Sequence, residues 1–366
     1  MLTEDFKSPS NNPIINSHGK SVAGGDKPAE KSQDRMTEGT SETVRFVVVA
    51  DGHGADGGIV AEECIKTITE WTRQNSDQIP TWMQQKMVQK VGEIFKKCHD
   101  NTRDALVAAE PGRYSDDSGV VRHTNRKHVS GGSTLSCVWI FRREGKLVIH
   151  SANVGDSDII LITHLDNKVI NSTHLSTDHS PLNQDEYERI MGYPQPLRLV
   201  YDCKHKGNPP IYQQLSSERK GSVVDDLRVQ TFVLNPWGNG LSTGNVRYTP
   251  SVYAMSPRES SDESAVAMTR CIGDFQGHPF GLSWVPSQEQ KVLDQDDGAS
   301  YALFVGSDGI WDCYKYEDFA RKCVSYLNES DSIVECVDRL VTETVVFSKV
   351  TFGKNYDDST LVGVII

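Results

Sequence analysis

The chain has 366 residues, and its 50 Asp and Glu against 38 Lys and Arg give a formal net charge of −12 at pH 7. This balance argues against a nucleic-acid-binding protein, because such proteins neutralise phosphates with clustered Lys and Arg. Apolar residues make up 37% of the chain and charged residues 24%, fractions typical of a globular protein with a sizeable core.

The longest apolar runs are strand-sized, as in FVVVA at residues 46–50, and fall short of the roughly 20 residues that a membrane span needs. The first residues contain neither a basic segment followed by an apolar core nor a Gly at position 2. We therefore expect no membrane partner. The 8 cysteines never pair as CxxC, and several lie in apolar periodic segments, so we expect a reducing compartment, the cytoplasm or the nucleus.

Along the chain, residues 1–17 are polar and aperiodic and are expected to form a flexible arm ahead of one domain at 18–366. A β-branched run at 44–50 predicts a buried strand. Apolar residues spaced three and four apart predict helices around 61–71 and 83–105. The polar segment 111–130 is typical of a surface loop.

The next runs, at 134–141, 146–153 and 159–163, predict three strands whose short connections indicate an antiparallel meander. A short helix is expected at 183–190. Residues 193–264 are rich in Pro, Gly, Ser and Asn, and we interpret them as an insertion or mobile element without a core of its own, with one strand-like run at 229–234. A strand at 301–306, a helix near 333–344 and a closing strand at 360–366 complete the pattern. Strands and helices are segregated, which favours an α+β fold.

Acidic residues stand at the ends of several predicted strands. Asp51, Asp156 and Asp308 follow apolar runs, Asp357 precedes the last one, and Asp312 comes one helical turn after Asp308. A single Asp at such a place is usually a turn or helix cap. Four strand-to-Asp junctions in one chain instead predict a site for Mg²⁺ or Mn²⁺, which prefer oxygen ligands.

His53 lies between two glycines, two residues after Asp51. Most lone histidines are ordinary surface residues. This one is placed at a strand end next to a proposed ligand, and an imidazole that titrates near neutral pH can protonate a leaving oxygen. We therefore predict that His53 is a general acid.

Seven segments together resemble the ordered motifs of the metal-dependent protein phosphatases, the type 2C family. They are VVVADGHG (47–54), GGST (131–134), ANVGDS (152–157), LSTDHSP (175–181) followed by E-x-x-R-I (186–190), AMTRCIGD (267–274), VGSDGIWD (305–312) and DDST (357–360). Each motif alone is weak, but the full series in order is specific.

The resemblance implies a four-layer α-β-β-α sandwich, in which two antiparallel sheets are flanked by helix pairs. It also implies two Mg²⁺ or Mn²⁺ ions with a possible third, held by Asp51, the carbonyl of Gly52, Asp308 and Asp357, with Asp156 and Asp312 at the third position. A metal-bridged hydroxide would attack phosphoserine or phosphothreonine directly, and His53 would protonate the departing oxygen. The implied partners are phosphorylated proteins, and we expect a monomer.

The chain departs from the family at the phosphate-binding position. An Arg of the family is replaced by Ala29, and the first residue of an acidic pair is Gln33, while Asp34 keeps the second acid and is expected to support the metal site. Lys27 or Lys31 is the candidate for holding the phosphate, although either could equally be a solvated surface charge.

Two further departures concern Asp158 and the insertion. Asp158 stands where the family usually has an Arg after ANVGDS, and we interpret it as a solvent-facing choice. The insertion at 193–264 precedes AMTRCIGD, where we expect it to affect access to the site, substrate choice or partner binding. The missing Arg and the Gln33 replacement leave a second hypothesis open, a pseudophosphatase that acts as a binding or scaffold module. The ligand set alone also leaves a third, a generic metal hydrolase for small phosphate esters.

Overall fold

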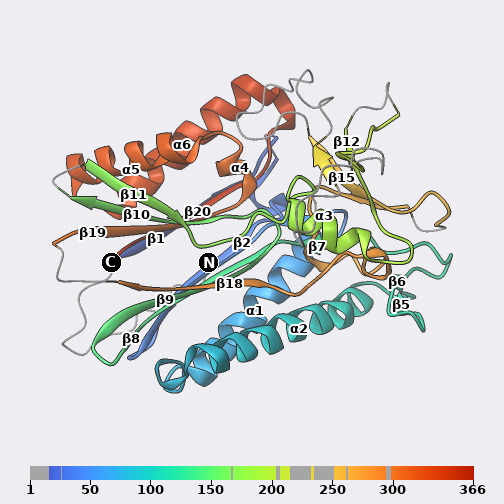
Figure 1. The fold of residues 1–366 in the computed structure, drawn as a ribbon, viewed down its shortest axis with the longest axis horizontal. Helices are drawn as coiled ribbons and strands as arrows, with labels where there is room; N and C mark the ends of the chain where they lie inside the picture. Colours follow the sequence, from blue (N-terminus) through green and yellow to red (C-terminus); the bar gives the residue numbers. More distant parts are fainter. Residues whose placement is uncertain are drawn as a thin grey trace, which may run out of the picture.

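In the computed structural model, described residues are 16–25, 27–165, 168–202, 207–214, 232–234, 251–260, 263–293 and 298–366. Two five-stranded antiparallel sheets lie face to face, with a pair of long helices on the outer face of each (Figure 1). The predicted α+β four-layer sandwich is confirmed. The predicted arm at 1–17 lies outside the described residues up to position 15, and Ser17 already begins the first strand.

The first sheet has the order β1-β20-β19-β10-β11 and the second the order β18-β9-β8-β3-β2. The strands of the first sheet are β1 Ser17–Val22, β20 Ser359–Ile365, β19 Ser300–Gly306, β10 Ile159–Leu165 and β11 Lys168–His174. Those of the second are β18 Ser287–Leu293, β9 Lys146–Val154, β8 Leu135–Arg143, β3 Val44–Ala50 and β2 Arg35–Thr40.

The helix pairs cover the outer faces of the two sheets. Helices α1 Gly57–Asn75 and α2 Gln84–Ala109 pack on the second sheet. Helices α5 Tyr316–Ser330 and α6 Ile333–Phe352 pack on the first, together with the short α4 Asp308–Trp311. None of the helices in the described part of the chain has both the length and the apolar composition that crossing a membrane requires.

Both faces of strand β3 are apolar because both are buried, each in a different cluster. Successive side chains of a strand point to opposite faces. Phe46 and Val48 therefore join the cluster under α1 and α2, whereas Val47 and Val49 join the cluster between the two sheets. The continuous β-branched run follows from burial on both sides.

The predicted meander is wrong for its third strand. Strands β8 and β9 pair as expected, but β10 belongs to the other sheet, where it pairs with β19 and β11. The second edge of β9 is occupied by β18. The chain therefore crosses between the sheets after β9, at a turn where Gly155 has φ 92°. A short connection places two consecutive strands close together, but it does not require them to hydrogen-bond within one sheet.

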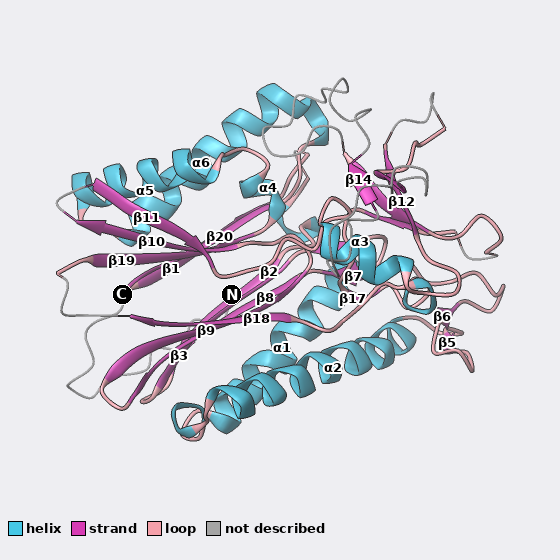
Figure 2. Ribbon diagram, viewed as in Figure 1, coloured by secondary structure: helices cyan, strands magenta, loops and turns pink. Residues whose placement is uncertain are grey.

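Smaller elements lie beyond the ends of the large sheets (Figure 2). Strands β4 Gly52–His53, β7 Gly132–Ser133 and β17 Ile272–Gly273 form one three-stranded sheet in the order β17-β7-β4. A second contains β12 Arg198–Tyr201, β15 Val252–Met255 and β16 Ala265–Val266. Two hairpins pair β5 Tyr114–Ser115 with β6 Val121–Arg122 and β13 Tyr212–Gln214 with β14 Phe232–Leu234.

The predicted insertion at 193–264 lies largely outside the described residues, and of its predicted strand only β14 is described. The described parts of this segment nevertheless contribute buried side chains to a hydrophobic cluster. Leu199, Ile211 and Ala254 are buried in a cluster shared with α3 Gln184–Met191 and with Leu282.

Candidate active site

Asp51 is fixed at the end of β3 by backbone and side-chain hydrogen bonds to Thr134. The Asp51 amide donates to Thr134 Oγ1 at 3.1 Å, and the Thr134 amide donates to the Asp51 carbonyl at 2.9 Å. Thr134 Oγ1 in turn lies 2.7 Å from Ser157 Oγ, next to Asp156. The motifs GGST and ANVGDS therefore place Asp51 and Asp156 at the same end of the fold.

Asp308 begins α4 directly after β19, and Asp312 lies one turn later, where its amide donates to the Asp308 carbonyl at 2.7 Å. Gly309 lets this turn approach the chain just before β20. A Cβ atom at Gly309 would lie 2.0 Å from the carbonyl oxygen of Asp358. Any side chain at Gly309 would therefore separate Asp308 from the Asp357–Asp358 turn.

Asp34 is buried behind this group of carboxylates. Ser307 Oγ donates to Asp34 Oδ2 at 2.9 Å and accepts from the Thr360 amide at 3.0 Å. Burial raises the pKa of Asp34 to about 6, and the charge of Asp357 adds to the increase. The serine and threonine of the VGSD and DDST motifs thus hold Asp34 against the strand ends.

We call Asp34, Asp51, Asp156, Asp308, Asp312 and Asp357 the carboxylate cluster. Burial raises the pKa of Asp308, and the nearby charges of Asp357, Asp156 and Asp312 raise it further. Burial also raises the pKa of Asp51, as do the charges of Asp34 and Asp308. Like charges held this close repel one another unless protons or cations compensate them.

The cluster has acceptor atoms that the protein does not satisfy. Among the described residues, Asp34 Oδ1 and Asp308 Oδ1 are buried without a hydrogen-bond partner. A buried carboxylate oxygen without a donor is costly, and hard divalent cations bind such oxygens. The residues present therefore fit Mg²⁺ or Mn²⁺.

His53 lies beside the cluster and is held by Asp274. Its Nε2 atom is 2.5 Å from Asp274 Oδ2. Burial lowers the pKa of His53, but the charge and hydrogen bond of Asp274 outweigh this, and the pKa is raised above its usual value. The opposite occurs at Asp274, where burial raises the pKa but His53 brings it below its usual value.

The small sheet β17-β7-β4 creates this pair. His53 stands opposite Gly132, and Gly132 stands opposite Gly273. A Cβ atom at Gly132 would lie 2.1 Å from Asp274 Oδ2 and 2.5 Å from His53 Nε2. Asp274 itself has φ 42°, an uncommon conformation for a residue other than glycine. The glycine of the middle strand therefore leaves the space in which the two side chains meet.

Cys271 is a third member of this group. Its Sγ lies 3.5 Å from Asp274 Oδ2, and one ligand atom each of Cys271, His53 and Asp274 lie within 4.8 Å of one another. Burial and the Asp274 charge raise the pKa of the Cys271 thiol well above its usual value. We interpret Cys271 as a thiol donor to Asp274, because a metal ligand would have to be a thiolate.

Comparison with known proteins identifies the family. The sequence profile described as protein phosphatase 2C matches residues 26–197 and 252–346, more than half of the chain. The chain belongs to the protein phosphatase 2C family. The unmatched stretch between the two segments falls inside the predicted insertion.

Curated relatives of this protein phosphatase 2C family member are distant. A probable protein phosphatase 2C 73 from Arabidopsis thaliana is 24% identical over 236 residues, which cover 64% of this chain and 48% of that protein. Protein phosphatase 1H from Mus musculus is 23% identical over 224 residues, covering 59% and 40%. The chain thus spans less than half the length of these relatives.

Solved structures show the fold. A serine-threonine phosphatase 2C from Toxoplasma gondii has a TM-score of 0.59 at 16% identity, covering 98% of this chain and 96% of that one. A sex determining protein from C. elegans has a TM-score of 0.53 at 15% identity, covering 97% and 66%. The shared protein phosphatase 2C architecture therefore extends over nearly the whole chain.

The two lysines proposed to hold phosphate in this protein phosphatase 2C family member lie in different places. Lys27 Nζ is 3.2 Å from Asp358 Oδ1, beside Asp357. Asp358 also accepts hydrogen bonds from the amides of Gly24 and Gln33, both at 2.7 Å, and so fastens this segment next to the cluster. Lys31 is exposed at the end of the short helix Ala29–Lys31, where it makes no ion pair with the described residues.

Two other residues near the cluster are Asp158 and Trp311. Asp158 is not solvent-facing: it is 1% exposed, and Ser176 and Tyr316 donate to its carboxylate. An acid in place of the family Arg is thus accommodated by two hydroxyl donors. Trp311 is fully buried, and its Nε1 donates to the Gly306 carbonyl at 2.8 Å, so it packs inside the fold.

Proposed function

We propose that the chain is a Mg²⁺- or Mn²⁺-dependent protein serine/threonine phosphatase. It would hydrolyse phosphoserine and phosphothreonine by direct attack of water on phosphorus, without a phosphoenzyme. The single observation that carries the proposal is the position of the His53–Asp274 pair beside the carboxylate cluster. The charges of Asp156 and Asp357, two members of the cluster, contribute to raising the pKa of His53. The proposed general acid and the proposed metal ligands therefore belong to one site.

Asp51, Asp308, Asp357 and the Gly52 carbonyl would hold two cations, and Asp156 and Asp312 would serve a third. Bound cations would offset the phosphate charge and activate the attacking water. Asp34 would support the ligands from behind, because Ser307 holds one of its oxygens and leaves the other available.

His53 would deliver the proton that the serine or threonine oxygen needs as it leaves. When the ring is protonated, Nε2–H donates to Asp274. Nδ1, which is buried and has no partner among the described residues, remains to donate to the substrate. Asp274 thus orients the ring and stabilises its positive charge, as a carboxylate does in other histidine-dependent hydrolases.

Lys27 is our candidate for a contact to the phosphate. Its ammonium group is already next to the cluster and its side chain is 42% exposed, so it can be shared between Asp358 and a substrate. Lysine acts as a point charge and lacks the two-pronged geometry of arginine. We expect weaker phosphate binding than an arginine would provide.

The second candidate function is a pseudophosphatase that binds partners without hydrolysis. One observation favours it: Ala29 occupies the arginine position, and Lys27 is ion-paired with Asp358. The retained carboxylate cluster favours the enzyme, because a scaffold has no need of closely spaced, mutually repelling acids.

A phosphate-release assay separates the two functions. A phosphothreonine peptide and an aryl phosphate would each be incubated with Mn²⁺, Mg²⁺ or a chelator. We expect hydrolysis of both substrates with either cation and none with the chelator. Activity that survives the chelator would contradict the cation requirement, and no activity with any cation would favour the scaffold.

A further inference from the structure

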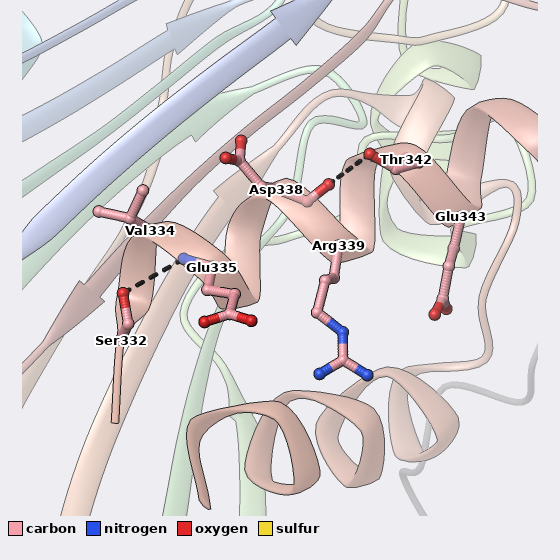
Figure 3. Close-up of a pocket in the computed structure, with 7 residues that line it drawn as sticks. All are labelled: Ser332, Val334, Glu335, Asp338, Arg339, Thr342 and Glu343. Atoms are coloured by element: carbon pink, nitrogen blue, oxygen red, sulfur yellow. Dashed lines mark hydrogen bonds between the residues drawn. The ribbon is translucent and has the colours of Figure 1, made fainter. Parts of the chain in front are cut away.

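One pocket outside the carboxylate cluster lies on α6. It has a volume of about 610 Å³ and is lined by side chains such as Asp338, Arg339 and Glu343 (Figure 3). Asp338, Arg339 and Glu343 are each paired within the fold. Arg339 pairs with Glu329 at 2.6 Å, and Glu343 pairs with Lys322 at 2.7 Å. This pocket gives no indication of a charged ligand.

A second pocket has a different electrostatic character. It occupies about 730 Å³ on the β5–β6 hairpin, and Arg122, Arg126, Lys127 and His128 are among its lining residues. We call it the hairpin groove. Asp116 and Glu263 also line it, but Asp116 is paired with Arg122. Arg126 and Lys127 are exposed and make no ion pair with the described residues. A local excess of basic residues in a chain of net charge −12 indicates an anionic ligand.

The hairpin presents these side chains on a fixed backbone. Asp116 Oδ1 accepts from the Ser118 amide at 2.9 Å and from the Val120 amide at 3.1 Å. In the turn that follows β6, the Arg126 amide donates to the His123 carbonyl at 2.8 Å, with Arg126 at φ 66°. A groove ordered before binding loses less conformational entropy when a ligand arrives.

Both ends of the hairpin are attached next to the candidate active site. Arg113, just before β5, lies 3.2 Å from Asp56, three residues after His53. The carbonyl of Ser130, in the segment that follows β6 and its turn, accepts from the Asp56 amide at 3.0 Å. Figure 1 shows β5 and β6 beyond the C-terminal end of α2, at one end of the molecule. An extended peptide that places its phosphate at the cluster can continue toward this hairpin.

We propose that the hairpin groove binds acidic side chains that flank the phosphorylated residue of a protein substrate. The inference rests on the proposed function and adds a substrate class to it. Arg126 and Lys127 supply the uncompensated charge, and the exposed ring of Tyr114 lines the same groove. The ligand is a peptide, because the segment that carries the groove is attached at Asp56, next to the candidate active site, where a protein substrate would place its phosphorylated residue.

Binding without catalysis tests the groove independently of the activity. A fluorescent, unphosphorylated peptide rich in Glu would be titrated with the full chain in a chelator, and its anisotropy followed. Wild type should bind it, and the double variant R126E/K127E should bind it at least about tenfold more weakly. The control K96E/K97E carries the same charge change on exposed positions of α2 and should bind like wild type.

Kinetics test the link to the substrate. The kcat/KM for a phosphothreonine peptide with acidic flanks should exceed that for one with neutral flanks. R126E/K127E should lose this preference while its rate on 4-nitrophenyl phosphate stays within about twofold of wild type. Unaltered peptide binding in R126E/K127E, or tighter binding of an RNA oligonucleotide of equal charge, would overturn the proposal. Peptide binding by a chain without hydrolytic activity would refute the phosphatase and leave the groove in place.

Discussion

His53 Nε2 and Asp274 Oδ2 lie 2.5 Å apart although the residues are 221 positions apart in the sequence. The contact fixes the orientation of the imidazole beside the carboxylate cluster. The last residue of the AMTRCIGD motif is therefore the hydrogen-bond partner of the imidazole.

The first prediction concerns the proton donor. His53→Gln should slow hydrolysis of alkyl phosphates, such as phosphothreonine peptides, by about 100-fold or more, because general-acid catalysis has this magnitude. Aryl phosphates should be affected far less, since their leaving group needs little protonation. Asp274→Asn should show the same selectivity with a smaller loss, because it acts through His53. Equal losses on both substrates would refute the general-acid assignment.

The second prediction concerns the space between these side chains. Gly132→Ala would place a methyl group 2.1 Å from Asp274 Oδ2 and should therefore displace the pair. We expect a large loss of turnover on phosphothreonine peptides. Gly92→Ala is the matched control. Gly92 lies within α2, and a Cβ atom there would meet nothing within 4 Å. It should keep full activity and gain up to about 1 kcal/mol of unfolding free energy.

The third prediction concerns Glu186, which joins α3 to the strand that leads to Asp274. Its carboxylate accepts from Arg189 at 2.8 Å, from Thr269 at 2.8 Å and from Arg270 at 2.5 Å. Glu186→Gln should lower the unfolding free energy by about 2–4 kcal/mol, because it leaves two arginines without their charge partner. Glu188→Gln, at an exposed position of the same helix, should change it by less than about 0.5 kcal/mol. Urea denaturation measures both, and equal effects would contradict the assignment.

The fourth prediction concerns acid sensitivity. Burial lowers the pKa of His179 to about 3, and Arg270 contributes to the decrease. The ring stays neutral in the folded chain, with Nε2 2.9 Å from Ser287 Oγ, but takes up a proton on unfolding below its ordinary pKa of about 6.5. Stability should therefore be fully present above pH 6.5 and decrease as the pH falls toward 3, by about 1.4 kcal/mol per pH unit for this one group.

His179→Gln tests this linkage. The variant is expected to be less stable at pH 7, because it loses the ring contacts, but its unfolding free energy should fall less steeply between pH 6 and pH 4. The comparison is made with wild type in chelator, so that bound cations do not contribute. Parallel pH profiles for the two proteins would exclude His179 as a source of the acid sensitivity.

The elements that the sequence predicted correctly are those with a local signal. The apolar run of β3 and the periodic faces of α1 and α2 depend on neighbouring residues, and an Asp after a buried strand is visible in the sequence itself. The ordered motifs then indicated the sandwich. Each of these signals can be recognised without knowing which strands pair.

The features that escaped prediction depend on contacts between distant segments. The transfer of β10 to the other sheet follows from β18 occupying the free edge of β9. The burial of Asp158 depends on Tyr316, which lies 158 residues away. The position of Cys271 in the sequence gave no indication that its thiol lies near His53. Lys31 looked equivalent to Lys27 in the sequence, but only Lys27 lies next to the Asp357–Asp358 turn.

A calorimetric titration of Mn²⁺ into chelator-treated, dialysed protein measures whether the carboxylate cluster is a divalent-cation site. We expect saturable binding of about two ions per chain, as in two-metal hydrolases, with a rise in the melting temperature as the ions bind. Asp308→Asn should weaken the binding at least about tenfold, whereas Asp318→Asn, at an exposed position of α5, should not. Identical isotherms for wild type and Asp308→Asn, or no binding by wild type, would contradict the account.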